Sequence, residues 1–442
     1  MESTSPSSLD PRSPSVYLGI DLGTSGVRVL LIDDAGEVLA KTGVPLPAPH
    51  RQDARVEQDP RIWWAAVERA LAALRKRVDL QRVRALAVDG TSGTVLLADA
   101  DGHPLGPALM YNDSRATDPA RRLARLAPPD SPVASVGSGL AKLLWLTEHA
   151  DTTAVRYFLH QADWIAGRLA GRPGYSDPNN ALKSGYDPVA NHWPAWLDQL
   201  PFPPAWLPKV QPAGSPIGPV DRRIAEQFGL PRDALVVSGT TDSTASFLAT
   251  GASQTGEAVT TLGSTLVLKV VCDAPISDPR YGIYSQPLGD RWLAGGASNS
   301  GGAVLRQFFT DQQMTQLEIR LDPDTPTGLD YYPLCGPGER FPVNDPDYPP
   351  RLSPRPDDEA RFFQGLLEGI TAIERLGYER LRDCGAPWPI RIRATGGGAR
   401  NAAWTRIRAR VLTIPLSPAR HTEAAFGSAW LARQGFITRS AP

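Results

Sequence analysis

The stretch Tyr17-Leu18-Gly19-Ile20-Asp21-Leu22-Gly23-Thr24-Ser25-Gly26 decides the fold class, because an apolar strand runs through an acidic residue into a turn of small residues. A second apolar strand over residues 27–33 follows directly, so the segment predicts a β-hairpin. The N–H groups and hydroxyls of this turn can bind a phosphate, since glycine permits close approach. Asp21 can hold Mg²⁺ or orient its waters. The alternative, an ordinary tight hairpin, stays open for the motif alone.

Length, charge and cysteine use limit the classes of protein to consider. The chain has 442 residues and a net charge of −1, which favours two or three domains and argues against nucleic acid or an anionic membrane as partner. No apolar run approaches the roughly 18 residues of a membrane span. Residues 1–15 are rich in Ser and Pro, so we expect a disordered tail and no secretory signal. Three widely separated cysteines favour a reduced, cytoplasmic protein.

The second half of the chain repeats the strand–turn–strand pattern of the first hairpin. Residues 258–271 again read as strand, Gly/Ser/Thr turn and strand, with Gly263, Ser264 and Thr265 in the turn. Two phosphate-type hairpins predict two similar domains that face each other, with ligands in the cleft. We place the domains at residues 16–234 and 235–436, followed by a tail at 437–442.

An acidic residue after a strand and a glycine marks the start of the predicted second domain. Asp242 follows Ser238-Gly239-Thr240-Thr241 and begins a predicted helix over residues 242–250. It can be a helix N-cap, for which aspartate is well suited. It can also be a general base at the end of a strand, where α/β folds place their chemistry.

A run of three glycines precedes the last part of the chain. Gly396, Gly397 and Gly398 follow a predicted strand and lead into a helix, whose N-terminus can face a phosphate. Asn401 and Trp404 are three residues apart and share one helix face, where an amide and an indole would suit an adenine ring. The alternative places Trp404 in the core.

Two polar clusters lie beside apolar segments of the first half. Residues 89–94, Asp-Gly-Thr-Ser-Gly-Thr, and residues 111–115, Tyr-Asn-Asp-Ser-Arg, carry the hydroxyl and amide groups that a polyol binder needs. They can also be two polar turns. Asp99 and Asp101 lie in a further turn, where the spacing lacks the late Glu of a calcium loop and favours a plain turn.

Taken together and in this order, these motifs resemble those of the FGGY carbohydrate kinases, of the actin-like ATPase superfamily. The resemblance covers about residues 16–436 and includes a closing helix near residues 423–432. It implies an α/β fold with two actin-like (ribonuclease H-like) domains facing across a nucleotide/sugar cleft. It also implies ATP and Mg²⁺ as cofactors, a small-molecule sugar as substrate, and a monomer or homodimer.

Within the family, the residues of the motifs are similar to those of the short ribulose/xylulose kinase-like proteins of cyanobacteria and plants. Most xylulose kinases carry Gln-Met-His near Thr91-Ser92 and a Trp at Tyr111, so the departure favours D-ribulose over D-xylulose. The resemblance implies transfer of the ATP γ-phosphate to the terminal C5 hydroxyl. Kinases of other polyols, an actin-like ATPase switch and a weak sugar sensor are the alternatives.

The resemblance also assigns roles to residues. Asp242 would be the catalytic base, and Asp21 would hold Mg²⁺, most simply through water. Both would contact the substrates. Ser92 and Asn112 would bind sugar hydroxyls. The residues implied in binding ATP are Gly23, Thr24, Ser25, Gly263, Ser264, Thr265, Gly396, Gly397, Gly398, Asn401 and Trp404, with Ser25 also near the substrate.

Overall fold

The computed structural model describes residues 15–128 and 131–440, and their contacts divide them into two compact units. The first unit holds the described residues of Met1–Ala127, Ser131–Leu248 and Glu423–Pro442, and the second holds those of Pro128–Asp130 and Ala249–Thr422. Most of the tail expected at residues 1–15 lies outside the described residues. In the described part of the chain, no helix is both long and apolar enough to cross a membrane.

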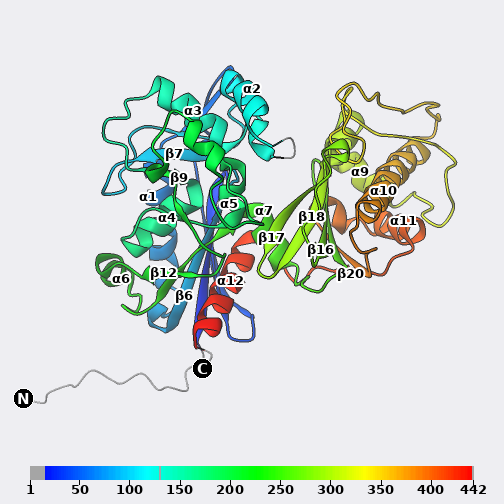
Figure 1. Ribbon diagram of the computed structural model, residues 1–442. Coiled ribbons are helices and arrows are strands. Elements are labelled where there is room, and N and C mark those ends of the chain that lie inside the picture. The colour runs from blue at the N-terminus through cyan, green and yellow to red at the C-terminus, as the bar shows by residue number, and fades with distance from the viewer. Residues whose placement is uncertain (1–14, 129–130, 441–442) are drawn as a thin grey trace, which may run out of the picture. The chain divides into compact units, whose positions relative to one another are not determined.

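The first unit is built on a mixed sheet in the order β12-β13-β6-β1-β2-β3, in which β14 also pairs with β6 (Figure 1). The predicted hairpin is present: β1 and β2 are antiparallel, and Asp21 lies opposite Arg28. Next to it, β1 and β6 run parallel. The strands are β1 (Val16–Leu22), β2 (Gly26–Asp33), β3 (Val38–Pro45), β6 (Val83–Gly90), β12 (Pro216–Pro219), β13 (Leu235–Val237) and β14 (Thr240–Thr241).

A second, smaller sheet in this unit has the order β4-β5-β8-β7-β9. Its strands are β4 (His50–Gln52), β5 (Arg55–Gln58), β7 (Val95–Ala98), β8 (Ala108–Leu109) and β9 (Tyr157–His160). A two-stranded sheet pairs β10 (Tyr175–Ser176) with β11 (Lys209–Val210). The helices of the unit are α1 (Pro60–Arg75), α2 (Thr117–Leu126), α3 (Gly139–His149), α4 (Gln161–Ala170), α5 (Pro178–Ala181), α6 (Arg222–Phe228), α7 (Asp242–Ala249) and α12 (Ala424–Ser440).

The last helix, α12, belongs to the first unit, although the sequence placed residues 235–436 in the second domain. It lies along β1 and β6 (red against blue in Figure 1). Glycine makes this packing possible, because a Cβ at Gly19 would lie only 1.9 Å from the carbonyl oxygen of Ala425. β13 also joins this sheet through parallel pairing with β6. The helix continues to Ser440, through most of the expected tail at residues 437–442.

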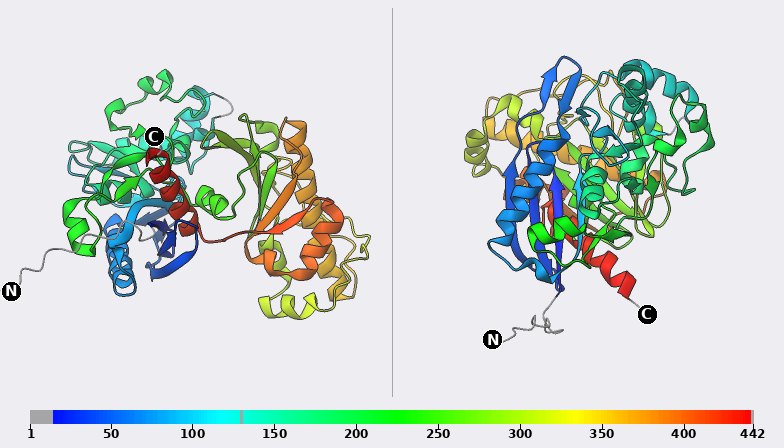
Figure 2. Two further views of the ribbon diagram at one scale, coloured as in Figure 1. Left: turned by 90° about the horizontal axis from the view of Figure 1, so that it is seen from below. Right: turned by 90° about the vertical axis from the view of Figure 1, so that its left-hand side faces the viewer.

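The second unit has one sheet in the order β17-β18-β16-β15-β19-β20, with helices α9, α10 and α11 along one face (Figures 1 and 2). The predicted second hairpin is present as β15 and β16. The strands are β15 (Glu257–Leu262), β16 (Leu266–Cys272), β17 (Tyr284–Leu288), β18 (Arg291–Ser298), β19 (Arg391–Thr395) and β20 (Leu416–Pro418). The helices are α8 (Gly302–Phe308), α9 (Asp311–Glu318), α10 (Glu359–Asp383) and α11 (Ala402–Leu412).

Candidate active site

Three acidic residues meet at one edge of the main sheet of the first unit. β1, β6 and β14 are parallel, so their carboxyl ends lie at the same edge. The β1–β6 register places Asp21 beside Asp89, and the β14–β6 register places Thr240 beside Asp89, two residues before Asp242. Sequence reasoning gave catalytic roles to Asp21 and Asp242 but placed Asp89 only in a polar cluster, because its partner on β1 is distant in sequence.

The Asp21–Asp89 pair is largely removed from water. Asp21 is 5% exposed and accepts a hydrogen bond from Arg28 Nη1 at 3.0 Å, while Asp89 is fully buried and accepts one from Ser428 Oγ at 2.6 Å. Burial raises the pKa of Asp21, an effect that Arg28 partly offsets. Burial also raises the pKa of Asp89 well above its usual range, and the charges of Asp21 and Asp242 add to the rise. A bound divalent cation would relieve this repulsion, so the pair fits Mg²⁺.

Asp242 is the first residue of α7 and is partly buried. Its Oδ1 accepts a hydrogen bond from the backbone N–H of Ser243 at 2.6 Å. In this first turn of the helix, the helix dipole favours the ionised carboxylate. An ionised carboxylate at the carboxyl edge of the sheet can accept a proton from a hydroxyl.

Each of the two hairpin turns is closed by the N–H of its glycine, although the first turn is one residue longer. In the first, Gly23 N–H donates to the carbonyl of Gly26 at 3.0 Å; in the second, Gly263 N–H donates to that of Thr265 at 3.2 Å. Ser25 and Ser264 lie exposed near the tips of their turns. Because these glycine N–H groups close the turns, the hydroxyls and other N–H groups are the donors left to face a phosphate.

A pocket of about 500 Å³ lies beside the second hairpin, within the second unit. This volume is typical of small-ligand sites. Gly396 has φ +84°, and a Cβ there would lie 2.5 Å from the carbonyl oxygen of Leu262, so the glycine turn packs directly on the hairpin. Gly263, Ser264, Gly397 and Gly398 all line the pocket. Sequence reasoning missed the wall formed by α8 and α9, which includes Gly302, Leu305, Met314, Thr315 and Glu318.

Asn401 and Trp404 also line this pocket, but both have structural roles. Asn401 is the N-cap of α11 and accepts a hydrogen bond from the backbone N–H of Trp404 at 2.6 Å. Trp404 is only 3% exposed, belongs to the core of the unit, and donates its indole N–H to Thr371 Oγ1 at 3.0 Å. The indole is therefore a largely buried core side chain that also lines the pocket, and its contact with ATP stays a prediction.

The position of Trp404 leads to a prediction that separates these two interpretations. Trp404→Phe should lower the free energy of unfolding by about 1–3 kcal/mol, because the hydrogen bond to Thr371 is lost with part of the buried ring. ATP affinity should change less than about threefold, since little indole surface is available to a ligand. Denaturant unfolding and calorimetric titration with ATP measure the two quantities. A large loss of ATP affinity at unchanged stability would restore the stacking interpretation.

In the core of the second unit, a buried polar network fixes the second hairpin to two helices. Arg408 of α11 donates two hydrogen bonds to Glu374 of α10, at 2.8 and 2.7 Å, and both side chains are 1% exposed. Glu374 also accepts from Thr260 Oγ1 of β15 at 2.5 Å, and this hydroxyl lies 2.7 Å from Tyr378 Oη. The network holds together the elements that present the hairpin and the glycine turn. Sequence reasoning did not select Glu374 or Arg408, since the two residues are 34 positions apart in the chain.

The two polar clusters of the first unit are joined by a hydrogen-bonded chain. The N–H of Tyr111 donates to Thr94 Oγ1 at 2.9 Å, Thr94 and Thr91 share a 2.6 Å hydrogen bond, and Thr91 Oγ1 donates to Gln161 Oε1 at 2.8 Å. The hydroxyl of Thr91 is thus used inside the protein. The next residue, Ser92, is partly buried. Gln161, at the start of α4, was missed because a single Gln after a strand gives no signal.

The second cluster contains a buried ion pair, Asp113–Arg115, and an amide side chain, Asn112, whose oxygen can accept a further hydrogen bond. The fully buried Asp113 accepts hydrogen bonds from Val56 N–H at 2.7 Å and from Arg115 Nη2 at 2.6 Å. Arg115 also lies over the ring of Trp145 at 4.7 Å. In contrast, Asn112 Oδ1 is buried and accepts no hydrogen bond from the residues that the structure describes. The amide of Asn112 therefore fits a ligand hydroxyl.

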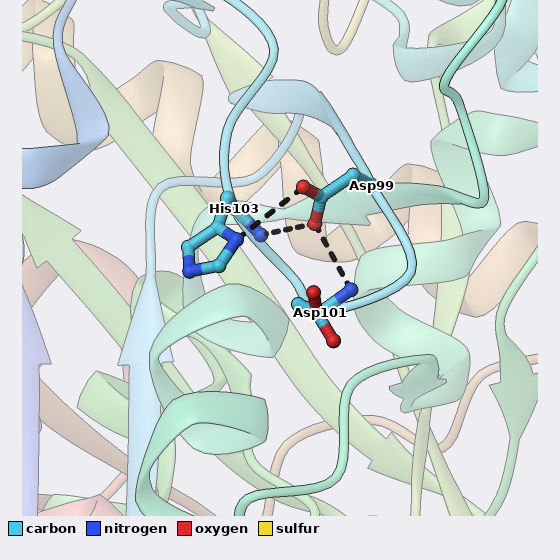
Figure 3. A group of neighbouring side chains, drawn as sticks. All are labelled: Asp99, Asp101 and His103. Atoms are coloured by element: carbon cyan, nitrogen blue, oxygen red, sulfur yellow. Dashed lines mark hydrogen bonds and ion pairs between the residues drawn. The ribbon is translucent and has the colours of Figure 1, made fainter.

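The Asp99–His103 segment is a turn, as its spacing favoured. Figure 3 shows the Asp99 carboxylate accepting hydrogen bonds from the backbone N–H groups of Asp101 and His103, at 3.0 and 2.8 Å. It also lies 3.3 Å from His103 Nδ1. Ligand atoms of the three residues come within 4.8 Å of one another, but the turn already uses the Asp99 oxygens. These contacts account for the residues without a metal.

The chain is similar to kinases of xylulose and of gluconate. The xylulose kinase of Escherichia coli strain K12 is 27% identical over 417 residues, which cover 90% of this chain and 84% of that kinase. The gluconokinase of Bacillus subtilis strain 168 is 25% identical over 429 residues, which cover 89% of this chain and 82% of that protein. The crystal structure of the xylulose kinase from Rhodospirillum rubrum has a TM-score of 0.85 at 26% identity, covering 95% of this chain and 90% of that chain.

Two family models account for nearly all of the described chain. The N-terminal domain of the FGGY family of carbohydrate kinases matches residues 16–249, and the C-terminal domain of the same family matches residues 258–434. The two matched ranges contain the two hairpins, the acidic edge and the glycine turn. The chain therefore belongs to the FGGY family of carbohydrate kinases.

Proposed function

We propose that this protein transfers the γ-phosphate of ATP to the terminal C5 hydroxyl of a ketopentose, with D-ribulose as the preferred substrate. The observation that carries the proposal is the gathering of Asp21, Asp89 and Asp242 at one carboxyl edge of the sheet. Such an edge suits a reaction in which a hydroxyl loses its proton beside a divalent cation and phosphate.

In this proposal the three acidic residues have different roles. Asp242 accepts the proton of the attacking hydroxyl and orients its oxygen toward the γ-phosphorus. Asp21 holds Mg²⁺, which neutralises phosphate charge when bound. Asp89 supports Asp21 from the neighbouring strand. The turns at Gly23–Gly26 and Gly263–Thr265 bind phosphate oxygens, and the pocket beside Gly396–Gly398 takes the adenosine.

The sugar binds, in this proposal, to the joined polar clusters of the first unit. Ser92 and Asn112 contact its hydroxyls, and the acceptor capacity of Asn112 Oδ1 supports this role. D-Ribulose is favoured by the Thr91-Ser92 pair and by Tyr111, which is 44% exposed. The similar proteins named xylulose kinases make D-xylulose the second candidate.

A panel of sugars tests the substrate. ADP release should be stimulated most by D-ribulose, more weakly by D-xylulose, and little by L-ribulose, D-gluconate or glycerol. The reason is that a site built to hydrogen-bond the hydroxyls of its substrate rejects analogues that leave its buried polar groups unpaired. A coupled ADP assay gives kcat/KM for each sugar. The highest kcat/KM with D-xylulose would replace D-ribulose by the second candidate. ADP release that no sugar stimulates would instead support an ATPase switch.

A further inference from the structure

Lys142 is a fully buried cation whose hydrogen bonds all go to the backbone of loops. It lies in the first turn of α3 and is 0% exposed. Its Nζ donates to the carbonyl oxygens of Gly93 at 2.7 Å, Met110 at 2.7 Å and Gly137 at 3.2 Å. The three N–H groups of one ammonium thus match three carbonyls from three separate loops.

The three loops are in close contact with one another. Gly93 has φ +84°, and a Cβ there would lie 2.8 Å from the carbonyl oxygen of Gly137. A Cβ at Gly137 would lie 3.2 Å from the carbonyl oxygen of Tyr111. The carbonyl groups therefore converge on one point, which the ammonium of Lys142 occupies. Without Lys142, the carbonyls of Gly93 and Gly137 would lose their bond to the ammonium, and that of Met110 would keep only the bond from Asp113 N–H at 2.9 Å.

We propose that Lys142 is a positioning residue for the acceptor sugar, which sets the spacing between Ser92 and Asn112. Ser92 directly precedes Gly93, and Asn112 follows Met110 by two residues, so two of the three carbonyls lie within two residues of a predicted sugar ligand. This inference rests on the sugar-binding role proposed above for those residues. Lys142 itself acts through the loops and does not touch the sugar.

If Lys142 acts through its hydrogen bonds, sugar affinity depends on the protonation state of Lys142, whereas a purely steric role of its side chain would not cause this dependence. Only the ammonium form has three N–H donors, since the neutral amine has two. Burial lowers the pKa of Lys142 to about 7, with Lys183 and Arg115 contributing repulsion and Asp113 attraction. If sugar binding needs the ammonium form, sugar affinity must fall as the pH rises through about 7.

The test compares Lys142→Met and Lys142→Gln with a matched control, Trp164→Phe. Methionine keeps the length and apolar stem but has no donor, whereas glutamine keeps two N–H donors. Trp164 also donates from a buried position to a carbonyl of the first unit, that of Gly102 at 2.9 Å, which lies outside the three loops. Hydrogen exchange of residues 91–94, 110–113 and 135–138 is measured for each variant. Calorimetry with D-ribulose, D-xylulose and ATP is done at pH 6.0, 7.0 and 8.5.

We expect Lys142→Met to speed hydrogen exchange in these three segments and to weaken sugar binding by about tenfold or more, with ATP affinity unchanged. The exchange rates and the sugar affinity of Lys142→Gln should lie between those of Lys142→Met and the wild type. Wild-type sugar affinity should fall from pH 6.0 to 8.5, whereas that of Lys142→Met should stay flat. Trp164→Phe should change only thermal stability.

The outcomes separate this inference from the proposed function. Unchanged exchange in the three segments of Lys142→Met would overturn the inference, whatever the sugar. A variant that binds sugar as tightly as the wild type would also overturn it, as would a wild-type affinity independent of pH. If Lys142→Met does not fold, Lys142→Gln and the wild-type pH series decide. If the wild type binds neither sugar, the proposed function fails, and the exchange data still decide whether Lys142 orders the loops.

Discussion

Asp242→Asn is expected to lower sugar phosphorylation by roughly 10²–10⁴-fold, the usual contribution of a general base, while sugar and ATP still bind. Asparagine keeps the size of the side chain and its ability to accept the Ser243 N–H, at 2.6 Å in the wild type. It cannot take up the proton of the attacking hydroxyl. A coupled ADP assay measures turnover, and calorimetry measures both affinities.

Asp221→Asn provides the matched control for this experiment. Asp221 is the N-cap of α6 in the same unit and accepts hydrogen bonds from Arg223 N–H at 2.9 Å and Ile224 N–H at 3.3 Å. Asparagine is an equally good N-cap, so the control should keep its stability and activity. If folded Asp242→Asn protein phosphorylates sugar at near the wild-type rate, Asp242 has only a structural role and the proposed mechanism is wrong.

Arg408→Met is expected to lower the free energy of unfolding by about 3–5 kcal/mol, because it leaves the charge of Glu374 buried without its partner. Both side chains of this pair are 1% exposed. Because the network also holds β15 and α11, ATP affinity should fall together with stability. Urea unfolding followed by tryptophan fluorescence measures the loss.

Two further variants show whether the loss comes from the unpaired charge. Arg375→Met, on the helix of Glu374, removes the Arg375–Glu379 ion pair at 3.0 Å and a hydrogen bond to the carbonyl of Val411, and because both contacts are exposed it should cost only about 0–1 kcal/mol. The double variant Glu374→Met/Arg408→Met removes both buried charges and should recover much of the stability. A small effect of Arg408→Met, similar to that of Arg375→Met, would contradict the expected role of the buried pair.

The local elements of this fold could be predicted because short-range patterns determine them. Both hairpins, β1–β2 and β15–β16, form where apolar strands flank a turn of small residues. The strand–helix junction at Asp242 is also local, since strand, turn and helix follow within a few residues. Asp21 and Asp242, which were selected with these elements, do lie at the carboxyl edge of the sheet of the first unit, and their catalytic roles stay predictions.

Long-range packing decided what these patterns could not. Ser428 donates a hydrogen bond to Asp89 across 339 residues of sequence, and α12 joins the first unit rather than the second. Trp404 looked equally suited to a ligand or to the core, and its bond to Thr371 of α10 placed it in the core.

The sequence alone therefore determined the family, the two phosphate-type hairpins and the two acidic residues predicted to be catalytic, because each depends on residues adjacent in the chain. Only the tertiary structure decided the partners of these residues: Asp89 beside Asp21, Glu374 beside Arg408, and three loop carbonyls around Lys142. The physical reason is that a buried charge or polar group must find its hydrogen bonds inside the fold. The groups that supply them come from whichever segments the packing brings close.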